Sequence, residues 1–190
     1  MGLMIHSLGE VPTDAQRGYF VYLLDYGWHE PLGEVLFKNF DRMAEQASRN
    51  NSVVLRGLVG SHFVDEVLSW HHVNGQPADK ILPAILVTTK NPHDFRIAEM
   101  TSRNKDGAQH PMLLIPLREA CKSTSDVATL IEKIFSDIRD GKELSQFQIA
   151  QEMHSGKKGA LADALILRPT ISGVGVDLKE IFRWLNVRKK

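Results

Sequence analysis

Two apolar runs near the start of the chain enclose an amphipathic stretch. Residues 19–24 are all aromatic, branched or aliphatic, a composition typical of a buried strand. In residues 32–47 apolar side chains recur at helical spacing, and Pro31 suits a first helical turn because its φ is fixed and it lacks an N–H. A second apolar run, residues 53–55, follows a short polar turn. The pattern predicts a strand, a helix and a second strand, and such a crossover favours a parallel pair.

The rest of the chain continues the alternation of strands and helices. Ser61 is expected to cap a helix that ends near residue 73, and Ser123 to cap an amphipathic helix that ends at Gly141. Prolines in two of the predicted strands cannot donate a ladder hydrogen bond, which favours a strand start or a sheet edge. The other expected elements are a loop or short edge strand (1–17), strands (81–89, 112–117, 162–168), a long polar loop (90–111) and helices (144–153, 177–186).

Charge and composition narrow the classes of function. The chain of 190 residues has 23 basic and 23 acidic side chains, and 43% of its residues are hydrophobic. These values suit one globular domain and give no overall field that favours nucleic acid or an anionic membrane. No basic patch with interleaved aromatic residues is present, so we expect no nucleic-acid partner.

Cysteine content and the N-terminal residues indicate a cytoplasmic protein. Cys121 is the single cysteine, so an intrachain disulfide is impossible and a reducing compartment is expected. Residues 1–16 lack the basic start and apolar centre of a secretory signal. No apolar run approaches the roughly 20 residues of a membrane helix, so we expect no membrane partner.

Two short motifs resemble a known family. Residues 25–32 read Asp-Tyr-Gly-Trp-His-Glu-Pro-Leu, which resembles the strand end and the Trp-Cys-x-Pro-Cys active site of the thioredoxin family. Residues 82–84, Leu-Pro-Ala, are similar to that family's cis-proline segment, and the order of elements over roughly residues 19–140 is that of the thioredoxin fold. The resemblance implies an α/β three-layer sandwich with a mixed sheet over residues 1–142. Residues 143–190 would form a C-terminal helical extension packed on the same domain.

The active-site cysteines of that family are absent from this chain. His29 and Leu32 stand in their places, and neither side chain can attack a disulfide. The resemblance therefore implies a redox-inactive protein that keeps the family's recognition surface, which holds an extended peptide beside the cis-proline loop. On this hypothesis the chain is a protein-binding subunit or adaptor of a larger intracellular complex. The residues expected at the contact are Trp28, His29, Glu30, Pro31, Leu32, Leu82 and Pro83. The alternative is that Trp28 and Leu32 only pack in the core of another α/β protein.

A second resemblance predicts an enzyme. Residues 61–68, followed by the apolar run 81–86, resemble part of a TIR domain, in which a serine and an aromatic residue precede a catalytic glutamate. That resemblance implies hydrolysis or cyclisation of NAD with Glu66 as the key acid. The serine-to-glutamate spacing is one residue short of the family's pattern. Solvated acids on a capped helix are the other interpretation of the same stretch.

Smaller clusters predict neither a metal nor a cofactor. His62 and Glu66 lie four residues apart, but a metal needs three or four converging ligands. Glycines at positions 57 and 60 lack the lysine of a P-loop. Whether Arg56, His62 and Glu66 form a nucleotide site is left open by the sequence.

Overall fold

The structure is a computed structural model of the 190-residue chain. It describes all residues except 28–29, 72, 74–77, 102–110, 155–165 and 168–190. The expected link at residues 155–159 and the expected helix at 177–186 lie outside the described residues.

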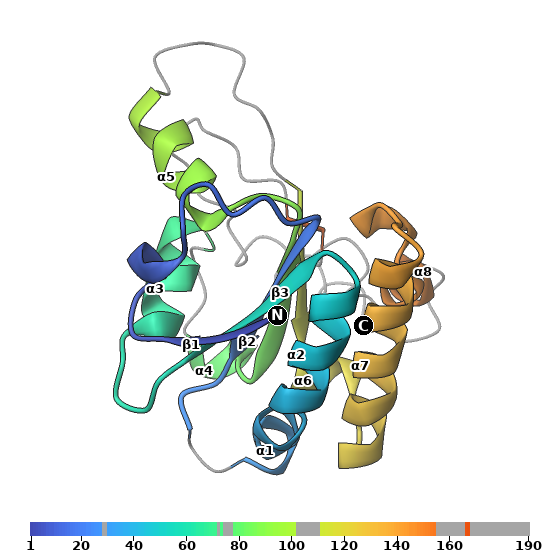
Figure 1. The fold of residues 1–190 in the computed structure, drawn as a ribbon. Coiled ribbons are helices and arrows are strands. Elements are labelled where there is room, and N and C mark those ends of the chain that lie inside the picture. The colour runs from blue at the N-terminus through green and yellow to red at the C-terminus, as the bar shows by residue number, and fades with distance from the viewer. Residues whose placement is uncertain (28–29, 72, 74–77, 102–110, 155–165, 168–190) are drawn as a thin grey trace, which may run out of the picture.

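A six-stranded mixed sheet forms the centre of the molecule (Figure 1). Its order is β1-β3-β2-β4-β5-β6; β1, β3 and β2 run parallel, and β4, β5 and β6 join by antiparallel pairing. The predicted parallel pair in the strand–helix–strand unit is therefore confirmed. The strands are β1 (Gly2–Ile5), β2 (Tyr19–Leu24), β3 (Ser52–Gly57), β4 (Ala84–Thr88), β5 (Met112–Pro116) and β6 (Ile166–Leu167).

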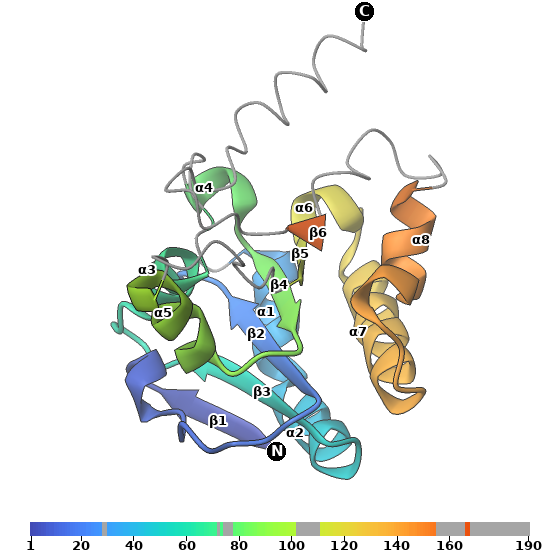
Figure 2. The same cartoon turned by 90° about the horizontal axis from the view of Figure 1, so that it is seen from above.

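Helices lie on both faces of this sheet (Figure 2). The helices are α1 (Pro31–Lys38), α2 (Phe40–Arg49), α3 (Phe63–Trp70), α4 (Ala78–Ile81), α5 (Pro92–Thr101), α6 (Leu117–Ala120), α7 (Thr124–Arg139) and α8 (Gln148–His154), with short 3-10 turns η1 (Leu8–Glu10) and η2 (Leu144–Gln146). One core cluster joins α1, α2, α7 and α8 to the sheet, and a second joins η1, α3 and α5 to its opposite face. The α/β class and the mixed sheet are confirmed, and the layering is compatible with a three-layer arrangement.

Alternation along the strands explains the two cores. In β2, Val21 and Leu23 belong to the cluster beneath α1, α2 and α7, whereas Phe20, Tyr22 and Leu24 belong to the cluster beneath α3 and α5. All six β2 residues are buried. A strand covered on both faces has no polar side, which is why its sequence is an unbroken apolar run.

The long helix expected over residues 32–47 is two helices. Asn39 separates α1 from α2, with φ −98° and ψ 3°. Its side-chain amide donates to the Val35 carbonyl at 2.9 Å, so the side chain competes with the regular backbone pattern at this point. The break lets α1 and α2 pack along the same face of the sheet at different angles (Figure 1).

Three expected boundaries are wrong. The N-cap of α3 is His62 rather than Ser61, and its side chain forms no capping hydrogen bond. The strand expected to begin at residue 81 begins at Ala84, because Ile81 ends α4. The expected loop at 90–111 contains α5, whose start is stabilised by the Asn91 carboxamide accepting the His93 N–H at 3.0 Å.

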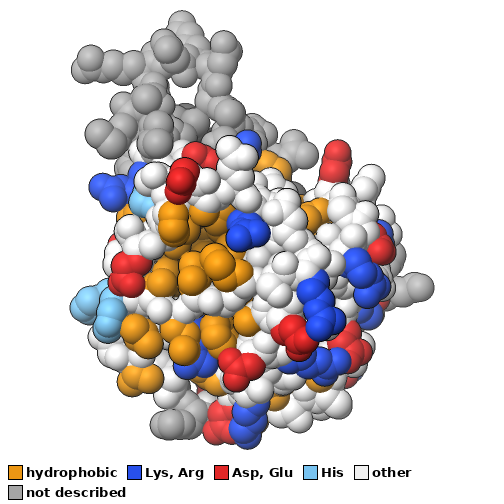
Figure 3. Space-filling view, viewed as in Figure 1, with side chains coloured by type: hydrophobic (Ala, Val, Ile, Leu, Met, Phe, Trp, Pro, Cys, Tyr) orange, Lys and Arg blue, Asp and Glu red, His pale blue; other side chains and the backbone are white. Residues whose placement is uncertain are grey.

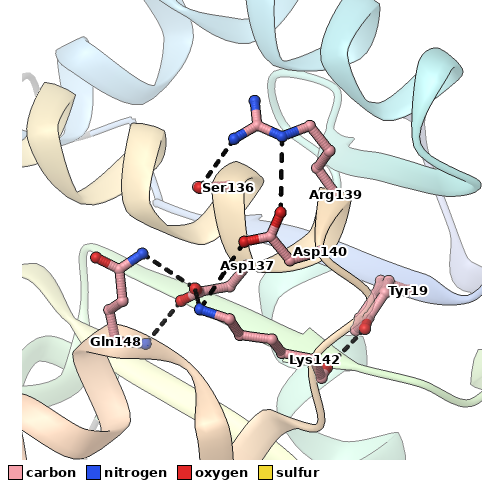
Figure 4. A network of polar contacts seen from close by, with 7 residues as sticks. All are labelled: Tyr19, Ser136, Asp137, Arg139, Asp140, Lys142 and Gln148. Atoms are coloured by element: carbon pink, nitrogen blue, oxygen red, sulfur yellow. Dashed lines mark hydrogen bonds and ion pairs between the residues drawn. The ribbon is translucent and has the colours of Figure 1, made fainter.

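Residues 142–148 are attached to α7 by a buried carboxylate and to the sheet by a tyrosine hydroxyl (Figure 4). Asp137 is fully buried and accepts from Lys142 Nζ at 2.7 Å, from the Gln148 N–H at 2.7 Å and from Gln148 Nε2 at 3.0 Å. The Tyr19 hydroxyl donates to the Lys142 carbonyl at 2.6 Å. The described start of the C-terminal segment, residues 143–154, is thus part of the same packed unit.

Candidate functional site

The carboxyl ends of β2 and β3 lie at one edge of the sheet, and the connections that follow them leave on opposite faces. After β2 the chain enters α1, which joins one core cluster through Leu36. After β3 it enters α3, which joins the other through Phe63. Because the two connections diverge, a crevice opens between the strand ends, the usual position of ligands in open α/β sheets.

The pairing of β2 with β4 brings the ends of two predicted motifs to this edge of the sheet. Leu24 at the end of β2 faces Ala84 at the start of β4 in the antiparallel register. The Leu82–Pro83 bond directly before Ala84 is cis. Pro83 therefore lies beside the chain that leads from β2 into α1, where the resemblance to thioredoxins places a cis-proline.

Three of the predicted contact residues lie at the start of α1. Pro31 is the first residue of the helix and is exposed, whereas Leu32 is half-buried against the core cluster under α1. Glu30 forms an ion pair with Arg118 of α6, in which the Arg118 Nε lies 3.1 Å from Glu30 Oε2. This pair connects the turn before α1 to the segment after β5. The Glu30–Arg118 pair and the apolar side chain of Leu32 therefore lie close together at the sheet edge.

The other predicted contact residues are placed differently. Leu82 and Pro83 are buried, and the Leu82 side chain belongs to the core cluster under α3 and α5. A partner could meet only backbone groups of this segment, in which the Leu82 N–H donates to the Ala78 carbonyl at 2.9 Å and Pro83 has no N–H. The Pro83 carbonyl already accepts the Leu117 N–H at 2.8 Å. Trp28 and His29 lie outside the described residues.

A cleft of about 720 Å³ lies at the divergence of β2 and β3. The residues around it belong to the ends of the two strands (25–27 and 56–57), the loop 58–62, the first turn of α3 (63–65) and one side of α1. Phe37, Leu58, Val59 and Phe63 give it apolar walls. The side chain of Val59 is 99% exposed, so this rim offers hydrophobic surface that the described chain leaves open to solvent.

Arg56 supplies the best-positioned charge in the cleft. Its guanidinium carbon lies 4.8 Å from the Phe37 ring centroid and 4.9 Å from the Phe40 ring centroid. Contacts of this kind hold a guanidinium by cation–π attraction and fix its orientation. Its Nε is buried, and no hydrogen bond or ion pair of this guanidinium is found within the part of the chain that the structure describes.

Tyr26 and Asp65 form the opposite wall. The Tyr26 hydroxyl donates to Asp65, and the side chain of His62 lies 3.8 Å from the same carboxylate. Burial, followed by the hydrogen bond and the negative charge of Asp65, raises the pKa of Tyr26 to about 12. The phenol therefore stays protonated over the neutral range and acts as a donor to Asp65.

Glu66, the acid expected for NAD chemistry, has a structural position. It does not line the cleft, although Asp65 beside it does. One carboxylate oxygen accepts from the Ser7 hydroxyl at 2.9 Å and the other from the Leu8 N–H at 2.6 Å. Both oxygens are therefore engaged with the segment that follows β1, and the geometry brings no support to an enzymatic role for Glu66.

The described residues hold no group of three or more His, Cys, Asp or Glu side chains that could bind a metal ion. Within the same part of the chain, every helix is too short or too polar to cross a membrane.

The sequence left open whether Arg56 binds a ligand, and it did not identify Phe37 or Tyr26 as residues of the cleft. A signal for Arg56 is present in the sequence: it is the first charged residue after the buried run of β3, and Gly57 follows it. Its two ring contacts could not be predicted, because they depend on where α1 and α2 meet. A scan against protein-family models and searches of the curated proteins and the solved structures found no match to this chain.

Proposed function

We propose that this chain is a redox-inactive, thioredoxin-like protein that binds a protein partner at the turn between β2 and α1. The proposed binding surface comprises Glu30, Pro31 and Leu32, next to the backbone at Pro83. Trp28 and His29, which precede it in sequence, belong to the same proposal.

The order of elements supports the thioredoxin-like part of the proposal. After β1 the chain runs through β2, the paired helices α1 and α2, β3, α3, β4, β5 and α7, which is the order expected from the resemblance. The insertion of α5 between β4 and β5 departs from it. The register that sets Leu24 against Ala84 brings Pro83 beside the β2–α1 turn.

The residues at the turn and the one thiol support the redox-inactive part of the proposal. Leu32 lies at the position of a family cysteine, and the side chain of Cys121 is 4% exposed within the core. A disulfide substrate needs an accessible thiolate, and a buried thiol does not offer one. The proposal therefore assigns binding, and not thiol chemistry, to the exposed start of α1.

One observation supports this role most strongly. Leu32 is half-buried at the sheet edge, with exposed Pro31 on one side and the Glu30–Arg118 ion pair close by in the chain and in space. A small apolar site rimmed by charge is the usual composition of a weak or transient protein contact. Partner side chains could pack on Leu32 while the rim sets orientation.

The proposal is tested by selecting peptides from a display library on the immobilised wild-type chain. Binding of the enriched peptides is then measured by fluorescence anisotropy for the wild type, Leu32→Asp and Trp28→Ala. We expect about a tenfold or larger loss of affinity, since a charge placed at the centre of an apolar contact costs a kilocalorie or more, roughly 1.4 kcal/mol per tenfold.

Glu119→Gln is the matched control, because Glu119 is exposed in α6, close to Arg118 in sequence but outside the proposed surface. Leu32→Ala is the milder second variant if Leu32→Asp does not keep the wild-type circular dichroism. Folded Leu32 and Trp28 variants that hold every enriched peptide as tightly as the wild type would remove the basis of the proposal.

A further inference from the structure

The cleft between β2 and β3 contains a positive charge that no described carboxylate neutralises. Arg56 lines it with its guanidinium stacked on Phe37 and Phe40, at 4.8 Å and 4.9 Å from their centroids. Within the described residues no acidic group lies at ion-pair distance from Arg56. An arginine held in this way loses little side-chain freedom on binding, and its planar fork suits a carboxylate or a phosphate.

The carboxylates that line the same cleft are each engaged with another group. Glu34 pairs with Lys38 at 3.1 Å, Asp65 accepts from the Tyr26 hydroxyl, and Asp25 accepts the Gly27 N–H at 3.1 Å. The acidic groups therefore have partners of their own. Because their donors are neutral, Asp25 and Asp65 keep their negative charge, and among the described lining residues Arg56 is the guanidinium that pairs with no carboxylate.

The loop after β3 lines the cleft together with Arg56 and contributes polar groups to it. The Ser61 hydroxyl is buried and has no hydrogen-bond partner. The position of a Cβ on Gly57 would lie 2.9 Å from this hydroxyl oxygen and 2.6 Å from Phe63 Cβ, so the loop closes tightly over Gly57. The α3 helix starts here without a side-chain cap, and residues of its first turn line the cleft.

The apolar walls indicate what the rest of the ligand is. Phe37, Leu58, Val59 and Phe63 line the cleft, and Val59 is almost fully exposed. Figure 3 shows hydrophobic side chains gathered on the face of the molecule that carries β1 and the loop after β3. A ligand with a flat apolar body would cover this surface, and a cavity of about 720 Å³ has room for one of small-molecule size.

We propose that this cleft binds a small organic anion, with a phosphate or carboxylate head at Arg56 and an aromatic body against Phe37. The head accepts hydrogen bonds from the Arg56 guanidinium. The body covers Leu58 and Val59. Its lining residues do not include Glu30, Pro31 or Leu32 of the proposed protein-binding surface, and its existence does not depend on that function.

The test uses the full chain and the fluorescent probe 1-naphthyl phosphate, with 1-naphthol, which has the same ring but no phosphate, as the neutral control. Saturable binding is measured by fluorescence for the wild type, Arg56→Met and Val59→Asp. Arg56→Met keeps an apolar stem over the two phenylalanine rings but removes the charge. We expect both variants to weaken phosphate binding about tenfold or more, the effect of removing or opposing a charge-assisted hydrogen bond.

Arg49→Met is the matched control, since Arg49 is an exposed arginine of α2 that pairs with Glu45 and does not line the cleft. It should bind the probe like the wild type. If Arg56→Met does not fold, Val59→Asp decides, because a fully exposed loop position tolerates the change. The proposal is overturned if the wild type binds no probe saturably, if 1-naphthol binds as tightly as the phosphate, or if the folded cleft variants keep wild-type affinity.

Discussion

The carboxylate of Glu66 stabilises the segment that follows β1. It accepts one hydrogen bond from the Ser7 hydroxyl and one from the N–H of Leu8, whose side chain is fully buried. A sequence motif drew attention to this acid for its chemistry, whereas its neighbours in space give it a structural role. The two roles predict opposite results on substitution.

Glu66→Gln is expected to lower the free energy of unfolding by about 1–3 kcal/mol, because a charged acceptor serves two donors and the amide can satisfy only part of that demand. Urea denaturation followed by circular dichroism measures the change. Glu119→Gln, at an exposed position of α6, should change stability by less than about 0.5 kcal/mol. Equal stabilities of the two variants would contradict the structural role of Glu66.

Tyr26 makes stability depend on alkaline pH. Its pKa is raised from 10.0 to about 12 by burial first, then by the hydrogen bond to Asp65 and by the charge of Asp65. The folded protein therefore holds this proton more tightly than the unfolded chain. The stabilisation is fully present below pH 10 and is lost as the pH rises from 10 to about 12.

Asp65→Asn is expected to bring the pKa of Tyr26 below about 12, since it removes the charge and weakens the hydrogen bond. Tyrosinate absorbance at high pH measures the titration, and Tyr26→Phe identifies which of the three tyrosines is observed. Burial also raises the pKa of Tyr19 and Tyr22, so these two should not titrate at the ordinary value. An unchanged titration of Tyr26 in Asp65→Asn would show that the contact with Asp65 does not exist in solution.

At the scale of elements, one buried side chain links α7 to the start of α8, in addition to the Lys133–Glu152 ion pair. Asp137 near the end of α7 accepts the backbone N–H of Gln148, the first residue of α8, together with the side chains of Gln148 and Lys142. The carboxylate is fully buried, so each donor that loses it must find another acceptor. The packing of α8 on α7 should depend on this residue.

Asp137→Ala is expected to cost about 2–3 kcal/mol of unfolding free energy, the range of a hydrogen bond to a charged group. It should also increase hydrogen–deuterium exchange in residues 142–154 more than in β2. Asp140→Ala, one turn along and half-exposed, serves as the control and should change neither quantity measurably. Uniform exchange changes over the whole chain would argue against a local role for Asp137.

The elements that the sequence predicted well are those whose local pattern agrees with their packing. β2 and β3 are apolar runs covered on both faces, and Ser123 forms the predicted cap of α7, with a reciprocal bond from Asp126. The break at Asn39 was not predicted, because the apolar spacing continues through it and only a side-chain hydrogen bond ends α1. The start of α5 was missed because Asn91 and Pro92 were interpreted as loop residues, although that pair also begins helices.

The candidate site also has parts that the sequence predicted and parts that it did not. The turn at Glu30–Leu32 and the segment at Pro83 were selected from sequence, and the register of β2 and β4 brings them together. Burial of Leu82 could not be predicted, since it depends on the packing of α4 and α5 over the sheet. The cleft at Arg56 needs three distant segments to meet, so local patterns gave only its glycine-rich loop.

At the scale of the whole molecule, two binding surfaces are proposed at one edge of the sheet. The first, at the start of α1, is proposed for a protein partner; the second, between β2 and β3, is proposed for a small anion. Their residues differ, because Val59 lines the cleft and Leu32 does not. A substitution in one should leave the other intact.

Protein binding at the β2–α1 turn is tested most directly with one enriched peptide. Its dissociation constant is measured for the wild type, Leu32→Asp and Val59→Asp. We expect Leu32→Asp to weaken peptide binding about tenfold or more and Val59→Asp to bind the peptide like the wild type. The contrary result, full affinity in a folded Leu32→Asp chain and loss in Val59→Asp, would move the protein-binding surface to the cleft and contradict the claim.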